Sequence, residues 1–240
     1  MSINAAATLS RALTILQDET GVRWPLAELR QWFNDALREI TLLKPTATSH
    51  SVVVPLENGT YQKLPDTYTR ALRVTRNLRS GQNAPRQGGR VISTVQRAML
   101  DTQNPDWHND LRTRQTREVR NACVDDAEPT AFWVYPGSDG KGFVEVVAAR
   151  VPEGIPAPSQ HLDELASYAA TIDLQDIYSN ALLDYVLYRA FSKEAQFAGS
   201  AAKAAACYGQ FMGALKTSTG NDMQLSLNAP PLVSAGGDGQ

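Results

Sequence analysis

Residues 184–215 read DYVLYRAFSKEAQFAGSAAKAAACYGQFMGAL, with bulky Tyr and Leu in the first half and mostly alanine in the second. Apolar side chains recur here every three or four residues, which predicts helix from Asp173 almost to Thr217, with a break or kink at Gly199. Around and beyond the break, one set of residues recurs at alternating spacings of four and three, which predicts that they form a seam packed against another helix. These residues are Phe197, Ala201, Ala204, Tyr208, Phe211 and Leu215.

The alanines off that seam predict a second surface on the same helix. Ala198, Ala202 and Ala206 leave room for another backbone to come close, which suits a protein that packs against copies of itself. Within a monomer the same residues would only make a tight core helix. We expect Ala198, Ala202 and Ala206 to lie at a subunit interface.

The N-terminal part of the chain is also helical by pattern. Residues 4–18 show one leucine stripe, and WPLAELRQWFNDALREITLLKP at 24–45 has Pro25 at a favoured first helical position. Its apolar residues recur at helical spacing: Leu29, Trp32, Phe33, Ala36, Leu37 and Ile40.

Residues 46–156 predict β-structure. HSVVVPLENGTYQKLP at 50–65 places two extended runs around Asn58-Gly59, the strongest short hairpin signal. A second hairpin is predicted at 129–152, turning in the Gly-rich stretch 137–142. Between them, residues 70–93 indicate a strand that runs into a Gly/Pro-rich loop.

The predicted fold class is therefore α+β, mainly α with a β-rich insert. Residues 1–45 and 157–217 are expected to form one antiparallel helix bundle, and 46–156 to add β-hairpins to it. Residues 218–240 are expected to be an extended, flexible tail that orders only on a partner. Its candidate contact residues are Leu225, Leu227, Pro230, Pro231, Leu232 and Val233.

Charge is distributed unevenly. Residues 70–120 hold eleven Arg, no Lys and four acids, whereas residues 121–176 hold ten acids and two basic residues. One interpretation is nucleic-acid contact by the arginines. The other is pairing with the acidic segment, in the same chain or a neighbouring subunit, and the matched charges favour it. Arg112, Arg114 and Arg117 are the arginines we assign to a subunit interface.

No catalytic or metal site is predicted, and no cofactor. The three histidines, His50, His108 and His161, are scattered without a second ligand at i+3 or i+4. Asp125-Asp126 precedes Pro129 and indicates a solvated turn, and GSDGKG at 137–142 lacks phosphate-loop spacing. Neither a signal peptide nor a membrane span is expected, and the two cysteines favour buried, reduced thiols.

Several pieces, in this order, resemble the head-to-tail adaptor (connector) proteins of tailed bacteriophages. They are the helix at 24–45, VPLENGTYQKLP at 54–65, NPDWH at 104–108, DDAEPTAFWVYP at 125–136, VEVVAARVP at 144–152 and ALLDYVLYRAFSKEAQFAG at 181–199.

The resemblance implies a non-enzymatic part of the virion that is made in the host cytoplasm. Such adaptors form a ring, commonly of twelve subunits, beneath the portal protein, and they present a platform to the tail or nozzle protein. Packaged DNA passes through the ring. The alternative functions are a nucleic-acid-binding module that uses residues 70–120 and, third, a cell-wall hydrolase, for which no carboxylate pair is apparent.

Overall fold

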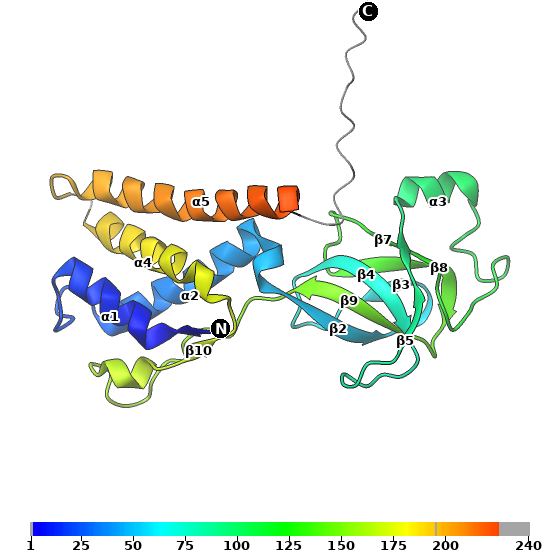
Figure 1. Cartoon of the computed structure of the whole chain (residues 1–240), viewed down its shortest axis with the longest axis horizontal. Coiled ribbons are helices and arrows are strands. Elements are labelled where there is room, and N and C mark those ends of the chain that lie inside the picture. The colour runs from blue at the N-terminus through cyan, green and yellow to red at the C-terminus, as the bar shows by residue number, and fades with distance from the viewer. Residues whose placement is uncertain (1, 195, 226–240) are drawn as a thin grey trace, which may run out of the picture. The chain divides into compact units, whose positions relative to one another are not determined.

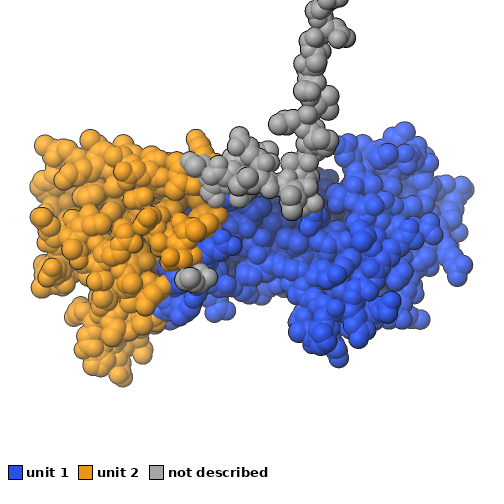
Figure 2. Space-filling view, viewed as in Figure 1, with its two compact units in different colours: residues 1–3, 37–156, 170–175 blue, residues 4–36, 157–169, 176–240 orange. Residues whose placement is uncertain are grey.

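The computed structural model describes residues 2–194 and 196–225, and for residues 217–225 it describes the backbone alone. The chain divides into two compact units (Figure 2). A β-rich unit comprises Met1–Ile3, Leu37–Pro156 and Ala170–Gln175, and a helical unit comprises Asn4–Ala36, Ala157–Ala169 and Asp176–Gln240. Helices and sheets are both extensive, so the predicted α+β class is confirmed.

The first two helices form where the apolar period predicted them. α1 (Ala5–Leu16) begins at Asn4, whose side-chain oxygen accepts the N–H of Ala7 at 3.3 Å and so caps the helix. α2 (Leu26–Leu43) starts one residue after Pro25, whose carbonyl accepts the first helical N–H bonds. Most of the predicted stripe of α2 is buried: Leu29, Phe33, Ala36, Leu37 and Ile40.

The long C-terminal helical segment is two helices that run in opposite directions, α4 (Ser179–Lys193) and α5 (Ser200–Leu225) (Figure 1). The ring of Tyr185 packs on Phe211, and Tyr188 packs on Tyr208, so rising numbers on α4 meet falling numbers on α5. Gly199 lies between the helices with φ of +86°, a backbone conformation that glycine adopts without strain. The predicted break is confirmed.

The predicted seam was wrong at its first two positions. Phe197 lies in the reversing turn, before α5 begins, and half of its surface is exposed, while Ala201 is exposed in the first turn of the helix. A linear pattern cannot show that the chain has folded back before the seam starts. The buried members are Ala204, Phe211 and Leu215.

α5 also continues to Leu225, past the predicted helix end at Thr217. The sequence from Thr217 onward lacks an apolar period, but helical hydrogen bonds are local, so the backbone can continue without one. Residues 226–240, which contain most of the predicted tail, lie outside the described residues.

The β-rich unit consists of two four-stranded sheets. The first has the order β2 (Ser49–Pro55), β9 (Phe143–Ala149), β4 (Arg70–Leu78) and β5 (Gly88–Val91). The second has the order β3 (Asn58–Lys63), β8 (Ala131–Asp139), β7 (Asn121–Val124) and β6 (Ser93–Thr94). The shorter elements are β1 (Ile3–Asn4) paired with β10 (Thr171–Ile172), α3 (Arg97–Gln103), and 3-10 turns at Pro45–Thr48, Leu165–Tyr168 and Asp176–Tyr178.

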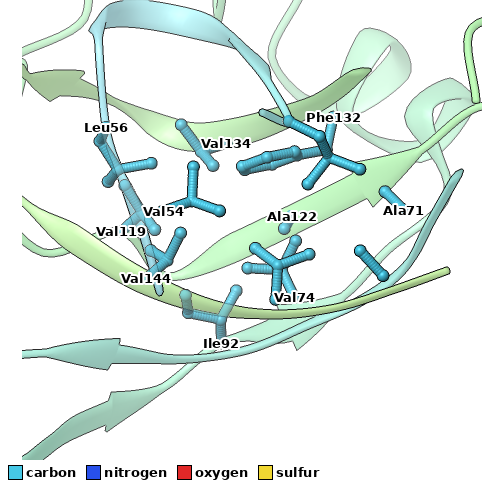
Figure 3. Packing of buried hydrophobic residues seen from close by; sticks show 13 residues of the cluster. Val54, Leu56, Ala71, Val74, Ile92, Val119, Ala122, Phe132, Val134 and Val144 are labelled. Carbon is cyan, nitrogen blue, oxygen red and sulfur yellow. The ribbon is translucent and has the colours of Figure 1, made fainter. Parts of the chain in front are cut away.

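A single apolar core lies between the two sheets, and side chains from both point into it (Figure 3). Alternate residues of β9 illustrate the two faces, because Val144, Val146 and Ala148 are buried in this core while Glu145 lies on the outer face. The other main members are Val54, Leu56, Val74, Ile92, Val119, Phe132 and Val134.

Both predicted hairpins were wrong. β2 pairs with β9 and β3 pairs with β8, so neither β2 and β3 nor β8 and β9 are partners. Residues 49–63 instead run antiparallel to residues 131–149 as one ribbon that bends from one sheet into the other. The N–H of Leu56 donates to the carbonyl of Gly142 at 2.9 Å and links the two chains of the ribbon at the bend.

The bend depends on close backbone contact. A Cβ on Gly142 would lie 2.3 Å from the carbonyl oxygen of Arg117, which no larger residue could avoid. Asn58-Gly59 begins β3 and makes no hairpin turn. Asn58-Gly59 and the Gly-rich stretch 137–142 do mark changes of chain direction, but these are the corners at which the chain passes from one sheet to the other. The pairing of the strands on each side of a corner depends on which residues are buried in the core.

Strands that follow one another in sequence pair as hairpins at β4–β5 and at β7–β8, and a buried carboxylate fixes the loop between β4 and β5. Glu145 receives hydrogen bonds from Arg76 at 2.7 Å, Ser51 at 2.9 Å and Thr75 at 3.2 Å, and also from Arg86 of the loop. Burial raises the pKa of Glu145, but the hydrogen bonds from Arg86, Ser51, Arg76 and Thr75 outweigh burial and lower the pKa to about 2.

This network predicts a pH-dependent stability. Because the folded-state pKa of Glu145 lies below its ordinary value of 4.5, its stabilisation is complete above that value and is lost as the pH falls towards 2. The shift corresponds to about 3 kcal/mol. In urea titrations, Glu145→Gln should be less stable than the wild type at pH 7, and the gap should narrow between pH 5 and 2. The control Glu153→Gln, at an exposed position, should follow the wild type. Parallel pH profiles for Glu145→Gln and the wild type would contradict the prediction.

Candidate assembly surfaces

The outer side of α5 is lined by small residues. Ala202, Ala206, Gly209 and Gly213 are exposed and follow one another at steps of four, three and four residues, which places them on one side of the helix. We call these four residues the alanine face. Ala198, the third predicted interface residue, is exposed but lies in the turn before the helix.

The opposite side of α5 is internal. Ala204 is 6% exposed and Phe211 is fully buried, and the Phe211 ring contacts Tyr185 of α4. The helix therefore has one side packed on its own unit and, between Ala202 and Gly213, one side that presents small residues to solvent. A second helix or strand could approach the alanine face more closely than a face of larger residues would allow.

Four arginines of the basic segment pair with carboxylates of the acidic segment in the same chain. Arg76 and Arg86 bind Glu145. Arg70 contacts Asp126, and Arg97 lies 3.9 Å from Asp125. All three carboxylates belong to residues 121–176, so the two charged segments pair in the same chain, as one of the sequence interpretations held.

The remaining arginines lie at the surface. Among the described residues, six arginines of the segment are exposed and form no ion pair: Arg73, Arg79, Arg90, Arg114, Arg117 and Arg120. Arg117 donates to the carbonyl of Arg79 at 3.4 Å, and Arg112 pairs locally with Asp106 at 3.0 Å. Of the three arginines predicted at a subunit interface, Arg114 and Arg117 thus have guanidinium groups that no carboxylate neutralises.

The predicted interface arginines lie on a loop, residues 104–118, that is anchored firmly. Trp107 is 1% exposed and donates its Nε1–H to Asp101 at 2.8 Å. His108 contacts the Thr60 hydroxyl at 2.8 Å and stacks on the Trp107 ring. At the outer part of the loop, Leu111 is 93% exposed. The sequence analysis missed Leu111, because an isolated leucine in an irregular segment gives no periodic signal.

The residues considered for chemistry have structural partners. Asp125 accepts the N–H of Ala127 at 3.0 Å and Asp126 is exposed, so the predicted solvated turn is confirmed. His161 pairs with Glu164, and His50 lies 3.6 Å from Asp173.

The described residues show neither a cluster of metal ligands nor a helix that could span a membrane. None of their His, Cys, Asp and Glu side chains come together in threes that could hold a metal ion. Likewise, the helices among residues 2–194 and 196–225 are too short or too polar to span a membrane. The candidate tail residues Leu227, Pro230, Pro231, Leu232 and Val233 fall outside this part of the chain, and the side chain of Leu225 is not described.

Comparison with known proteins identifies the class. Residues 3–232 match the family model described as SU10 adaptor protein, so nearly the whole chain has the pattern of a phage adaptor. The chain belongs to the SU10 adaptor protein family, and its place is in the virion. A search of curated proteins found no match.

The two sides of α5 predict different responses to the same substitution. Ala204→Leu should overpack the interior of the helical unit and lower the free energy of unfolding by about 1–3 kcal/mol. Ala202→Leu and Ala206→Leu should change it by no more than about 0.5 kcal/mol, because their side chains are exposed. Thermal or urea unfolding of the three variants measures the difference. If all three were equally destabilised, both sides of α5 would be internal.

Proposed function

We propose that this protein is a structural head-to-tail adaptor, without catalytic activity, that forms a ring beneath the portal and links the packaged head to the tail. The match to the adaptor family over residues 3–232 is the observation that supports it. Its partners would be the portal protein, a tail or nozzle protein and further copies of itself, commonly twelve. Packaged DNA would pass through the ring.

Two surfaces of the structure suit such a ring. The alanine face of α5, with Ala202 and Ala206 in its N-terminal half, would let the neighbouring subunit come close. Arg112, Arg114 and Arg117 would face carboxylates of the neighbour, because the charged segments pair only in part within one chain. Ring contacts of this kind join different patches of successive subunits and close by rotation.

The C-terminal residues would supply the attachment to the portal. Leu225, Leu227, Leu232 and Val233, with the prolines 230 and 231, form an apolar and proline-containing segment without a helical or strand period. Such a segment would bind in an extended form to a groove of its partner.

The decisive test is attachment of the purified protein to its portal ring, followed by electron-microscopic projection. The full chain should form a closed ring on the portal. A chain that ends at Leu225 should unfold at nearly the same temperature, because it keeps every described element, but it should attach much more weakly. Failure of the full chain to bind the portal would contradict the proposed function. Equal binding by the shortened chain would contradict only the role of the C-terminal residues.

A second candidate function is nucleic-acid binding, and the six exposed arginines without ion pairs favour it. The guanidinium group of arginine binds phosphate oxygens in a bidentate manner. The affinity of such a protein for DNA falls steeply as the salt concentration rises. The formal net charge of −2 speaks against a dedicated nucleic-acid domain, which usually has a basic character. We therefore rank this function below the adaptor.

Charge reversal separates the two functions. Arg112, Arg114 and Arg117 changed together to Glu should slow ring formation on the portal most at low salt, because charges beyond about 8 Å are screened at physiological ionic strength. Ala202→Leu and Ala206→Leu should block closure at every salt concentration, because a steric clash is not screened. The nucleic-acid function predicts the reverse: the charge-reversed protein would lose salt-dependent DNA binding and still form normal rings. Ala98→Leu, at an exposed alanine of α3, is the control for added bulk.

A further inference from the structure

We propose that Leu111 of one copy inserts into an apolar cavity on the β-rich unit of the next copy, so that the two form a knob-and-socket contact. The inference rests on the proposed ring and names the contact that would join its subunits. The loop that carries Leu111 and the cavity are separate patches of the chain, so a contact in which each copy donates to one neighbour and receives from another can propagate around a ring.

The knob is a large apolar side chain on a rigid support. Leu111 has the highest exposure, 93%, of the large apolar residues exposed in the described chain. Its loop is tied down by buried Trp107, by the Arg112–Asp106 pair and by the Thr113 hydroxyl, which donates to the Asp106 carbonyl at 3.2 Å. A side chain presented in this way loses little conformational freedom on binding, which favours affinity.

The socket is a cavity of about 290 Å³ within the same unit, formed by the end of α2 with the turn after it, the start of β4, the segment before β8 and the segment after β9. Its lining is largely apolar, and Leu42 at its rim is 73% exposed, so it is accessible from solvent. The lining residues are Arg38, Thr41, Leu42, Pro45, Thr69, Arg70, Pro129 and Val151.

The character of this cavity favours a side chain over a small ligand. Its volume is at the lower limit for ligand pockets, which measure roughly 300–1,000 Å³. Both arginines that line the cavity already interact within the chain, Arg70 with Asp126, and Arg38 too is not without a partner. Among its described lining residues, the cavity therefore offers no unpaired guanidinium group to an anionic small ligand. An inserted leucine would cover exposed apolar surface on both sides, which is the main source of favourable free energy in such contacts.

Charges around knob and socket are complementary. Arg114 lies three residues after Leu111, is exposed and forms no ion pair among the described residues, whereas Arg112 pairs with Asp106. On the turn directly before Pro129 of the socket, Asp126 pairs with Arg70, but Glu128 is exposed and its carboxylate accepts only a hydrogen bond, from the Tyr61 hydroxyl at 3.1 Å, within the described chain. With Leu111 inserted, Arg114 would face Glu128 of the next copy, and such a rim pair fixes orientation and speeds association. The complementarity is what commits the socket to a second copy of this chain.

The test uses two variants that each disable one half of the contact. Leu111→Asp removes the knob, and Leu42→Asp introduces a charge at the socket; both positions are exposed, so folding should be unaffected. Sedimentation velocity of the full chain over rising concentration should show self-association of the wild type. Each variant alone should associate at least about tenfold more weakly. Leu162→Asp, at a 56% exposed leucine of the helical unit, should behave as the wild type.

Mixing the two variants gives the sharper result. The Leu42→Asp chain keeps a working knob and the Leu111→Asp chain keeps a working socket, so an equimolar mixture should form dimers and nothing larger. A wild type that stays monomeric, or a mixture that stays monomeric while the wild type associates, would overturn the proposal. Weakening by Leu42→Asp alone would show that the cavity binds something other than Leu111, such as the C-terminal residues. None of these measurements needs the portal, so failure here is distinct from failure of the adaptor function.

Discussion

The bend of one antiparallel ribbon is the constraint on which the β-rich unit depends. Residues 49–63 pair with residues 131–149 through the corner between the two sheets, and the Leu56 N–H bond to the Gly142 carbonyl holds that corner. Because the ribbon contributes strands to both sheets, it determines which residues enter the common core and which lie outside. Glu145 is on the outer face for this reason, and the arginines of β4 and its following loop converge on it.

One buried amide ties further strands of the unit together close to this bend. Asn77, 1% exposed, donates to the carbonyls of Arg90 and Val119 and accepts the Val119 N–H at 2.9 Å, so it joins β4, β5 and the approach to β7. With these strands fixed, the segment that contains Trp107 and Leu111 is held on a stable support. Fixed loops of this kind on a rigid scaffold are where proteins commonly place their contact residues.

The sequence predicted elements better than it predicted their pairing. Both N-terminal helices, the break at Gly199 and the longer strands of the insert (β2, β3, β4, β8 and β9) followed from period and turn chemistry, whereas the short strands β5, β6 and β7 were not predicted. The two hairpins did not, because an Asn-Gly or Gly-rich stretch marks a change of direction without stating which strands become neighbours. Among the candidate surface residues, the exposure of Ala202 and Ala206 agreed with helical geometry. Leu111 could not be found, since its significance comes from exposure on an anchored loop and from a cavity built by four segments that are distant in sequence.

The sequence by itself determined the α+β class, the small-residue side of the last helix and the opposite charges of two adjacent segments, because each is a local property of composition or period. Only the tertiary structure decided which arginines are neutralised. Arg76 and Arg86 meet Glu145 because three strands and a loop converge there, whereas Arg114 and Arg117 project from a loop that no carboxylate of the described chain reaches. Pairing between residues far apart in sequence depends on how the ribbon bends, and that bend is fixed by the burial of a shared core, which no short stretch of sequence contains.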